Sequence, residues 1–124
     1  RQKLMGPRWG NRAATFRLDA NLPANFHDPV RRGAAAWNNA GSLFRFSENA
    51  SSTNTIVLAP ISSSTTLAST QIWYSPSTNQ ISRFTVTFNT SRTWTTTGQT
   101  GTFDIEAIAA HELGHALGLD HPGD

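Results

Sequence analysis

Residues 104–121 read DIEAIAAHELGHALGLDH, and this stretch near the end of the 124-residue chain is its most informative part. Asp104 is a residue type that caps helix N-termini, and Glu106 would place a negative charge in the first turn. Gly118 suits the left-handed conformation in which helices commonly end. The pattern therefore predicts a helix from Asp104 to about Leu117.

Two histidines of this predicted helix have the spacing of metal ligands. A helix advances about 100° per residue, so His111 and His115 would lie about 40° apart on one face and one turn apart along the axis. Glu112 would lie about 60° round the helix from His115, bordering that face without having to be a ligand. Catalytic zinc generally binds three protein ligands and leaves a fourth position for water. The spacing therefore predicts two imidazole ligands, with Glu112 within reach of that water.

The third ligand must be a histidine or a carboxylate, because the chain contains no cysteine. His121 completes the pattern HExxHxxGxxH of zinc peptidases. In a straight helix it would lie about 15 Å along the axis from His111, so the chain has to turn back, which Gly118 makes possible. We expect His121 to be the third ligand. Asp120 is the competing candidate, since carboxylates also bind zinc.

The composition limits the other classes of function. With 37% hydrophobic residues, 15% charged residues and a net charge of +2, the chain has the composition of one small globular domain. Its basic residues form no stripe of the kind that binds nucleic acid. No run of 18 apolar residues is present, so we expect no membrane-spanning helix. Arg1 as the first residue suggests a processed or trimmed chain.

Alternation of apolar and polar residues, together with short apolar segments, predicts five strands upstream of the motif. The clearest pattern has Phe84, Val86 and Phe88 facing one way and the intervening threonines facing the other. The order of helix and strands favours an α/β layer arrangement. The predicted strands span residues 13–18, 43–46, 55–59, 68–74 and 81–89.

A second helix is predicted at about residues 29–40. Asp28 followed by Pro29 has the order of an N-cap and a first helical position, and Gly41 is the expected terminator. Downstream of the last strand, a loop at residues 91–102 carries Trp94. We expect this tryptophan to anchor the loop against the core.

Several of these segments together resemble a known family. Phe103-Asp104-Ile105 leads into AAHELGHALGLDH at residues 109–121, and Pro7-Arg8-Trp9, Ala34–Trp37 and Phe88-Asn89 are weaker landmarks in the expected order. On these residues the chain resembles the matrixin branch of the metzincin zinc peptidases. The resemblance implies an α/β (α+β-like) fold, with a twisted, mostly parallel five-stranded sheet and two helices. Residues 68–74 would form an edge strand lining the cleft, where an extended peptide could add as another strand.

The same resemblance implies the extent of the domain. Residues 1–124 would form a single metzincin-like catalytic domain, from its N-terminal part through the zinc-binding helix. Matrixins continue through a methionine-bearing turn and a wall of the specificity pocket, whereas this sequence stops at Pro122-Gly123-Asp124 and has Met5 as its one methionine. We therefore expect the C-terminal subdomain to be lacking.

The motif and the resemblance together imply a zinc endopeptidase, and the resemblance alone implies that it is secreted and extracellular. We expect one catalytic Zn²⁺ held by His111, His115 and His121, with Glu112 as general base for the attack of a zinc-activated water on a peptide bond. The chain would act as a monomer on peptide or protein substrates, with no nucleic-acid or membrane partner. Calcium stays undecided, because few acidic residues are clustered.

Two other classes of function stay open from the sequence. The first is a noncatalytic, zinc-stabilised peptide-binding module, suggested by the missing methionine-bearing region. Glu112 argues against it, because structural zinc sites usually close the fourth position. The second is an esterase or amidase that uses the same activated water. A groove for an extended peptide would distinguish the endopeptidase from that class.

Overall fold

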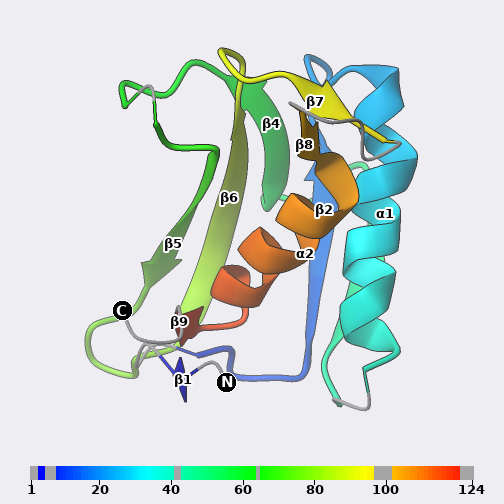
Figure 1. Cartoon of the computed structure of the whole chain (residues 1–124). Helices are drawn as coiled ribbons and strands as arrows, with labels where there is room; N and C mark the ends of the chain where they lie inside the picture. The colour runs from blue at the N-terminus through cyan, green and yellow to red at the C-terminus, as the bar shows by residue number, and fades with distance from the viewer. Residues whose placement is uncertain (1–2, 5–7, 41–42, 64, 97–101, 121–124) are drawn as a thin grey trace.

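The fold is built on a five-stranded sheet, which Figure 1 shows with two helices in front of it. The structure, a computed structural model, describes residues 3–4, 8–40, 43–63, 65–96 and 102–120. The sheet order is β3-β2-β4-β6-β5, in which the first four strands are mutually parallel and β5 is antiparallel to β6. The strands are β2 Ala13–Leu18, β3 Arg45–Glu48, β4 Thr55–Ala59, β5 Ala68–Tyr74 and β6 Ile81–Asn89.

This architecture confirms the predicted fold class. A mostly parallel five-stranded sheet with two helices is present, and β5 lies at its edge. Four of the five strands have the predicted bounds, and only β3 differs, because it begins at Arg45 rather than at residue 43. Leu43 is 67% exposed, whereas Phe46 is buried. The pairing with β2, in which Ala13 lies opposite Arg45 and Phe16 opposite Glu48, sets the position of this strand.

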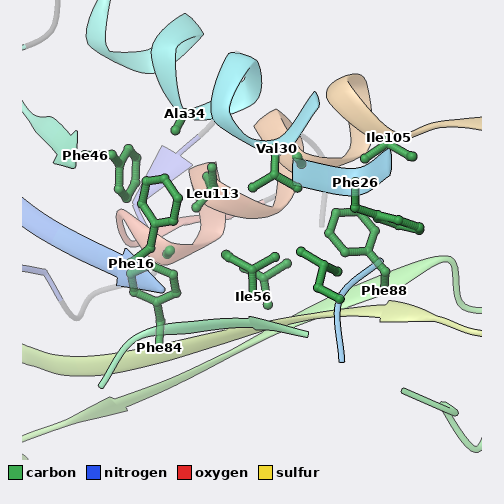
Figure 2. Packing of buried hydrophobic residues seen from close by; sticks show 14 of the residues in the cluster. Phe16, Phe26, Val30, Ala34, Phe46, Ile56, Phe84, Phe88, Ile105 and Leu113 are labelled. Atoms are coloured by element: carbon green, nitrogen blue, oxygen red, sulfur yellow. The ribbon is translucent and has the colours of Figure 1, made fainter. Parts of the chain in front are cut away.

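One face of the sheet packs against both helices, α1 (Ala24–Asn38) and α2 (Ile105–Ala116). On β6, Phe84, Val86 and Phe88 are buried in this core, as their alternation predicted, and the threonines between them lie on the other face. Figure 2 shows the apolar side chains filling the space between strands and helices. Because burial contributes about 25 cal/mol per Å² of apolar surface, this layer fixes how the helices lie on the sheet.

The predicted start of the first helix is wrong. Helix α1 begins at Ala24, directly after Pro23, so Asp28 is not its N-cap and Pro29 lies inside the helix. The physical reason is Phe26, which is 3% exposed and belongs to the hydrophobic core. Burial of this ring outweighs the one helical hydrogen bond that Pro29 cannot donate.

The end of α1 agrees more closely with the prediction. The helix ends at Asn38, and the N–H of the following Asn39 donates to Ala35 O at 2.9 Å. Gly41, the expected terminator, lies outside the described residues.

Ion pairs join α1 to its neighbours. Arg31 Nε lies 2.7 Å from Glu48 Oε1 of β3, and Arg31 Nη1 lies 2.9 Å from Asp28 Oδ1 one turn back. Arg32 Nε lies 2.6 Å from Glu106 Oε1 of α2. The hydrogen bonds from Arg31 lower the pKa of the Glu48 carboxyl below its usual value. All these groups are partly exposed, so the pairs orient the elements more than they stabilise them.

Two short strand pairs each contribute one strand next to α2 in the sequence, β8 before the helix and β9 after it. β7 (Trp94–Thr95) is parallel to β8 (Phe103–Asp104), so part of the predicted loop at 91–102 is strand. Trp94 packs against Phe88 and Phe26, with ring centroids 5.1 and 6.0 Å apart, which confirms its anchoring role. Directly after α2, β9 (Leu119–Asp120) pairs antiparallel with β1 (Lys3–Leu4).

Just before β4 begins, the side-chain amide of Asn54 bridges the two strands that flank β4 in the sheet, β2 and β6. Strand β2 pairs with β4 only at its last two residues, so its first part faces β6 across a gap. Asn54, just before β4, spans this gap: its Nδ2 donates to Thr15 O at 2.8 Å, and its Oδ1 accepts from Phe84 N at 3.0 Å. An open surface pocket of about 620 Å³, lined in part by Asn54, adjoins this bridge. The amide of Asn54 thus takes the place of a main-chain peptide group.

Replacing Asn54 by alanine should lower the free energy of unfolding by about 2 kcal/mol, because the Thr15 carbonyl and the Phe84 N–H lose their partner. Urea denaturation measures this difference. As a matched control, Asn21→Ala removes an exposed amide that donates to Leu58 O at 3.3 Å. That control should change the free energy by less than about 0.5 kcal/mol. Equal stability of Asn54→Ala and the unaltered protein would contradict the bridging role.

Candidate metal centre

Helix α2 starts where the sequence predicted. Asp104 is its N-cap, and Asp104 Oδ2 accepts a hydrogen bond from Ala107 N at 3.0 Å. Glu106 lies in the first turn, where a negative charge is favourable. The cap satisfies an N–H that has no partner within the helix, and it therefore fixes the first turn.

Two tryptophans and one glycine hold α2 against the rest of the molecule. Trp37 Nε1 donates to Ala110 O at 2.6 Å, and Trp9 Nε1 donates to Ala116 O at 2.7 Å. The Ala116 carbonyl is one of the last four of the helix, which lack helical partners, so Trp9 caps that end. A Cβ at Gly33 would lie 3.0 Å from Ala110 N, so the two helices approach closely because residue 33 has no side chain.

His111 and His115 face each other one turn apart on α2, as their spacing predicted. Their ring centroids are 4.9 Å apart, with the rings perpendicular. One ligand nitrogen of each and one carboxylate oxygen of Glu112 all lie within 4.8 Å of one another. Zinc binds imidazole nitrogen at about 2.0–2.1 Å, so side chains this close can share one ion after small rotations. The cluster therefore fits a zinc site.

The ring of His115 is oriented by a main-chain carbonyl. His115 Nδ1 lies 2.7 Å from Leu119 O, and a carbonyl oxygen only accepts, so Nδ1 is the donor. In the neutral imidazole the lone pair then belongs to Nε2. A hydrogen bond of this kind is the usual device that orients a metal-binding histidine. The hydrogen bonding of His115, like the spacing of the cluster, therefore fits a zinc ligand.

The turn after α2 has the predicted conformation. Gly118 has a φ of 95°, in the left-handed region, and its N–H donates to His115 O at 2.9 Å. The next residue, Leu119, pairs with Leu4 in the β1–β9 ladder. The chain thus leaves the helix at Gly118, and this turn carries the Leu119 carbonyl back to the His115 ring.

The third predicted ligand has no described position. His121 lies outside the described residues. For its competitor Asp120 only the backbone is described, paired with Lys3. The turn at Gly118 provides the departure from the helix that a third ligand from this segment needs. Which residue binds stays a prediction.

Glu112 lies on the buried side of α2. It is 6% exposed, and its Oε1 accepts a hydrogen bond of 2.8 Å from Thr70 Oγ1 on the edge strand β5. A buried carboxylate is costly without a donor, so this contact stabilises its position. The carboxylate is thereby held next to the two histidines.

Three contacts of the site were not found from the sequence. Thr70, Trp9 and Trp37 reach α2 across separations of 42, 107 and 73 residues, and no spacing pattern reports such contacts. The available signals were indirect. Thr70 lies in the strand predicted to line the cleft, and Trp9 and Trp37 each belong to a family landmark.

A buried glutamate between two histidines of one helix, beside the edge strand of a mostly parallel sheet, defines a zinc metallopeptidase type of site. The family model for matrixins matches residues 8–124, and the chain belongs to the matrixin family. No curated protein matches the chain significantly. Membership in this family of zinc metalloproteases implies zinc as the metal and peptides or proteins as substrates.

Replacing Gly118 by valine should lower zinc affinity about tenfold or more, because a β-branched residue at this φ is strained and displaces the carbonyl that orients His115. Competition with a chromogenic chelator measures this affinity. Asparagine tolerates the left-handed region better than valine does, so Gly118→Asn should lose clearly less zinc affinity than Gly118→Val. Zinc affinity in Gly118→Val equal to that of the unaltered chain would show that the turn does not support the site.

Proposed function

We propose that this matrixin is a zinc-dependent endopeptidase in which His111, His115 and His121 bind the metal and Glu112 is the general base. The observation that carries the proposal is the cluster of two histidines and a buried glutamate, with ligand atoms within 4.8 Å of one another. The orientation of His115 by Leu119 O supports its role as a ligand. The assignment of His121 as the third ligand rests on the sequence motif alone.

The chemistry that bound zinc supplies is a water of lowered pKa and a polarised peptide carbonyl. The protein itself moves a proton in this reaction, at the carboxylate of Glu112. Because Thr70 donates to Oε1, we assign the transfer to Oε2. This oxygen accepts the proton of the attacking water and then passes it to the leaving amine. No covalent intermediate with the protein is required.

The proposed substrate lies along β5. This strand is the edge of the sheet, paired on one side with β6, and an extended peptide can add to such an edge through main-chain hydrogen bonds. Thr70 of β5 contacts Glu112, so a peptide on this edge would pass close to the general base. This arrangement favours an endopeptidase over an esterase or amidase.

The remaining parts of the proposal come from the family resemblance. We propose one catalytic domain over residues 1–124, a monomeric state, and secretion to the extracellular space. Within the described residues, neither helix combines the length and apolar character needed to cross a bilayer.

Glu112→Ala should retain zinc but lose about 10²- to 10⁴-fold in kcat, because it removes the base and none of the three proposed ligands. The assay is mass-spectrometric cleavage of a mixed peptide library, with the zinc content determined on the same samples. The matched control is Glu106→Ala, which changes the same residue type on the same helix at a site paired with Arg32. It should cleave at the unaltered rate.

Unchanged turnover in Glu112→Ala would reject Glu112 as the base. Peptide binding without cleavage by the zinc-loaded, unaltered chain would favour the noncatalytic module instead.

Peptides carrying an N-methyl group at a main-chain N–H that pairs with β5 should lose about two- to tenfold in kcat/KM for each lost hydrogen bond. Methylating each amide of one cleaved peptide in turn measures this loss. The effect should alternate along the peptide, because successive amides of a strand point in opposite directions. A uniform response at every position would argue against strand addition.

A further inference from the structure

We propose that Thr70 is a positioning residue for Glu112, fixing the carboxylate in the orientation that proton transfer needs. This inference rests on the proposed function of Glu112 as general base. The edge strand β5 would then have two roles, pairing with the substrate and positioning Glu112.

The geometry rests on one hydroxyl that contacts one residue twice. Thr70 Oγ1 lies 2.8 Å from Glu112 Oε1 and 2.9 Å from Glu112 O. The single hydroxyl proton serves both oxygens, as a three-centre bond or by alternating between them. Because the main-chain oxygen is fixed by the helix, the side-chain oxygen is tied to a fixed point. Only a restricted set of Glu112 rotamers keeps both contacts.

The backbone of β5 places this hydroxyl rigidly. Thr70 pairs with Val86 of β6 in a ladder that runs from Ala68 to Tyr74. Ala68 and Ile72, which lie two residues to either side, pack against the hydrophobic core, so the Thr70 side chain shares the face of β5 that meets α2. A β-branched side chain on a paired strand has little χ1 freedom. The donor is therefore held in place before substrate arrives.

Burial makes the orientation matter. Glu112 is 6% exposed, so few waters are present to replace the hydroxyl as a donor. Thr70 donates to Oε1, which leaves Oε2 as the oxygen that accepts the proton in the proposed reaction. Without the hydroxyl, the carboxylate would sample rotations that exchange or withdraw its two oxygens.

The contact itself can be tested without metal. The chain contains three glutamates, Glu48, Glu106 and Glu112, so ¹³C labelling of glutamate gives three side-chain carboxyl resonances. In the zinc-free protein, Glu112→Gln identifies the resonance of Glu112. Thr70→Val, which replaces the hydroxyl by a methyl group, should shift that resonance, whereas Thr70→Ser should leave it near its original position. An unmoved Glu112 resonance in Thr70→Val would overturn the proposal.

Kinetics then distinguish positioning from a general structural role. In the zinc-loaded chain, Thr70→Val should lower kcat about tenfold while KM stays within about twofold, since misorientation of a catalytic group affects the transition state. Zinc affinity should be unchanged, and Thr70→Ser should recover most of kcat. The matched control is Thr85→Val, which removes a β6 hydroxyl 3.2 Å from Thr55 Oγ1 and should leave kcat unaltered.

The outcomes separate this inference from the proposed function. A shifted resonance with unchanged kcat in Thr70→Val would overturn the positioning role while leaving the endopeptidase intact. Loss of zinc affinity, or an equal loss of kcat in Thr70→Ser and Thr70→Val, would show a structural role and also overturn it. Failure of the unaltered, zinc-loaded chain to cleave any peptide would reject the proposed function and the positioning role with it, whatever the carboxyl resonance shows.

Discussion

The geometry of the metal centre depends on which face of α2 is buried. Ile105, Ala109, Leu113 and Ala116 recur at helical spacing and are at most 1% exposed, so apolar burial fixes the rotation of the helix about its axis. Position 112 then falls on the buried side of the helix, position 115 near the margin of the buried face, and the half-buried position 111 further round. Groups at such a margin are partly removed from water and still accessible to a ligand. The hydrophobic effect thus places polar side chains that it does not itself stabilise.

Asparagine side chains complete the hydrogen bonding of a sheet made of short strands. Asn38 Oδ1 accepts from Phe46 N at 2.8 Å and its Nδ2 donates to Phe46 O at 2.9 Å, which ties α1 to β3. Asn89, fully buried, donates to Thr66 O at 2.8 Å. An amide carries the same donor and acceptor as a peptide group, so it can end or extend a ladder where the backbone cannot. Asn38, Asn54 and Asn89 thus each have a structural use in this chain.

Local signals predicted the parts of the structure that local energetics decide. The alternation at Phe84–Phe88, the cap at Asp104 and the left-handed Gly118 each follow from a few neighbouring residues, and all are confirmed. The start of α1 was missed because the burial of Phe26 outweighs the local signal of Asp28 and Pro29. The motif likewise predicted the histidine pair. It could not predict the donors to α2, because those contacts depend on how distant segments pack.

The geometry of the metal centre depends on tertiary contacts and not on helix α2 alone. A free helix of 12 residues, the length of α2, is marginal in water. Its last turn is held by Trp9, 107 residues away, and the segment that orients His115 is paired with β1. The orientation of His115 therefore depends on the N-terminal segment, which docks beside α2 through Lys3–Leu4 and Trp9. Since a metal that binds only this arrangement stabilises it, zinc binding and docking of that segment must reinforce each other.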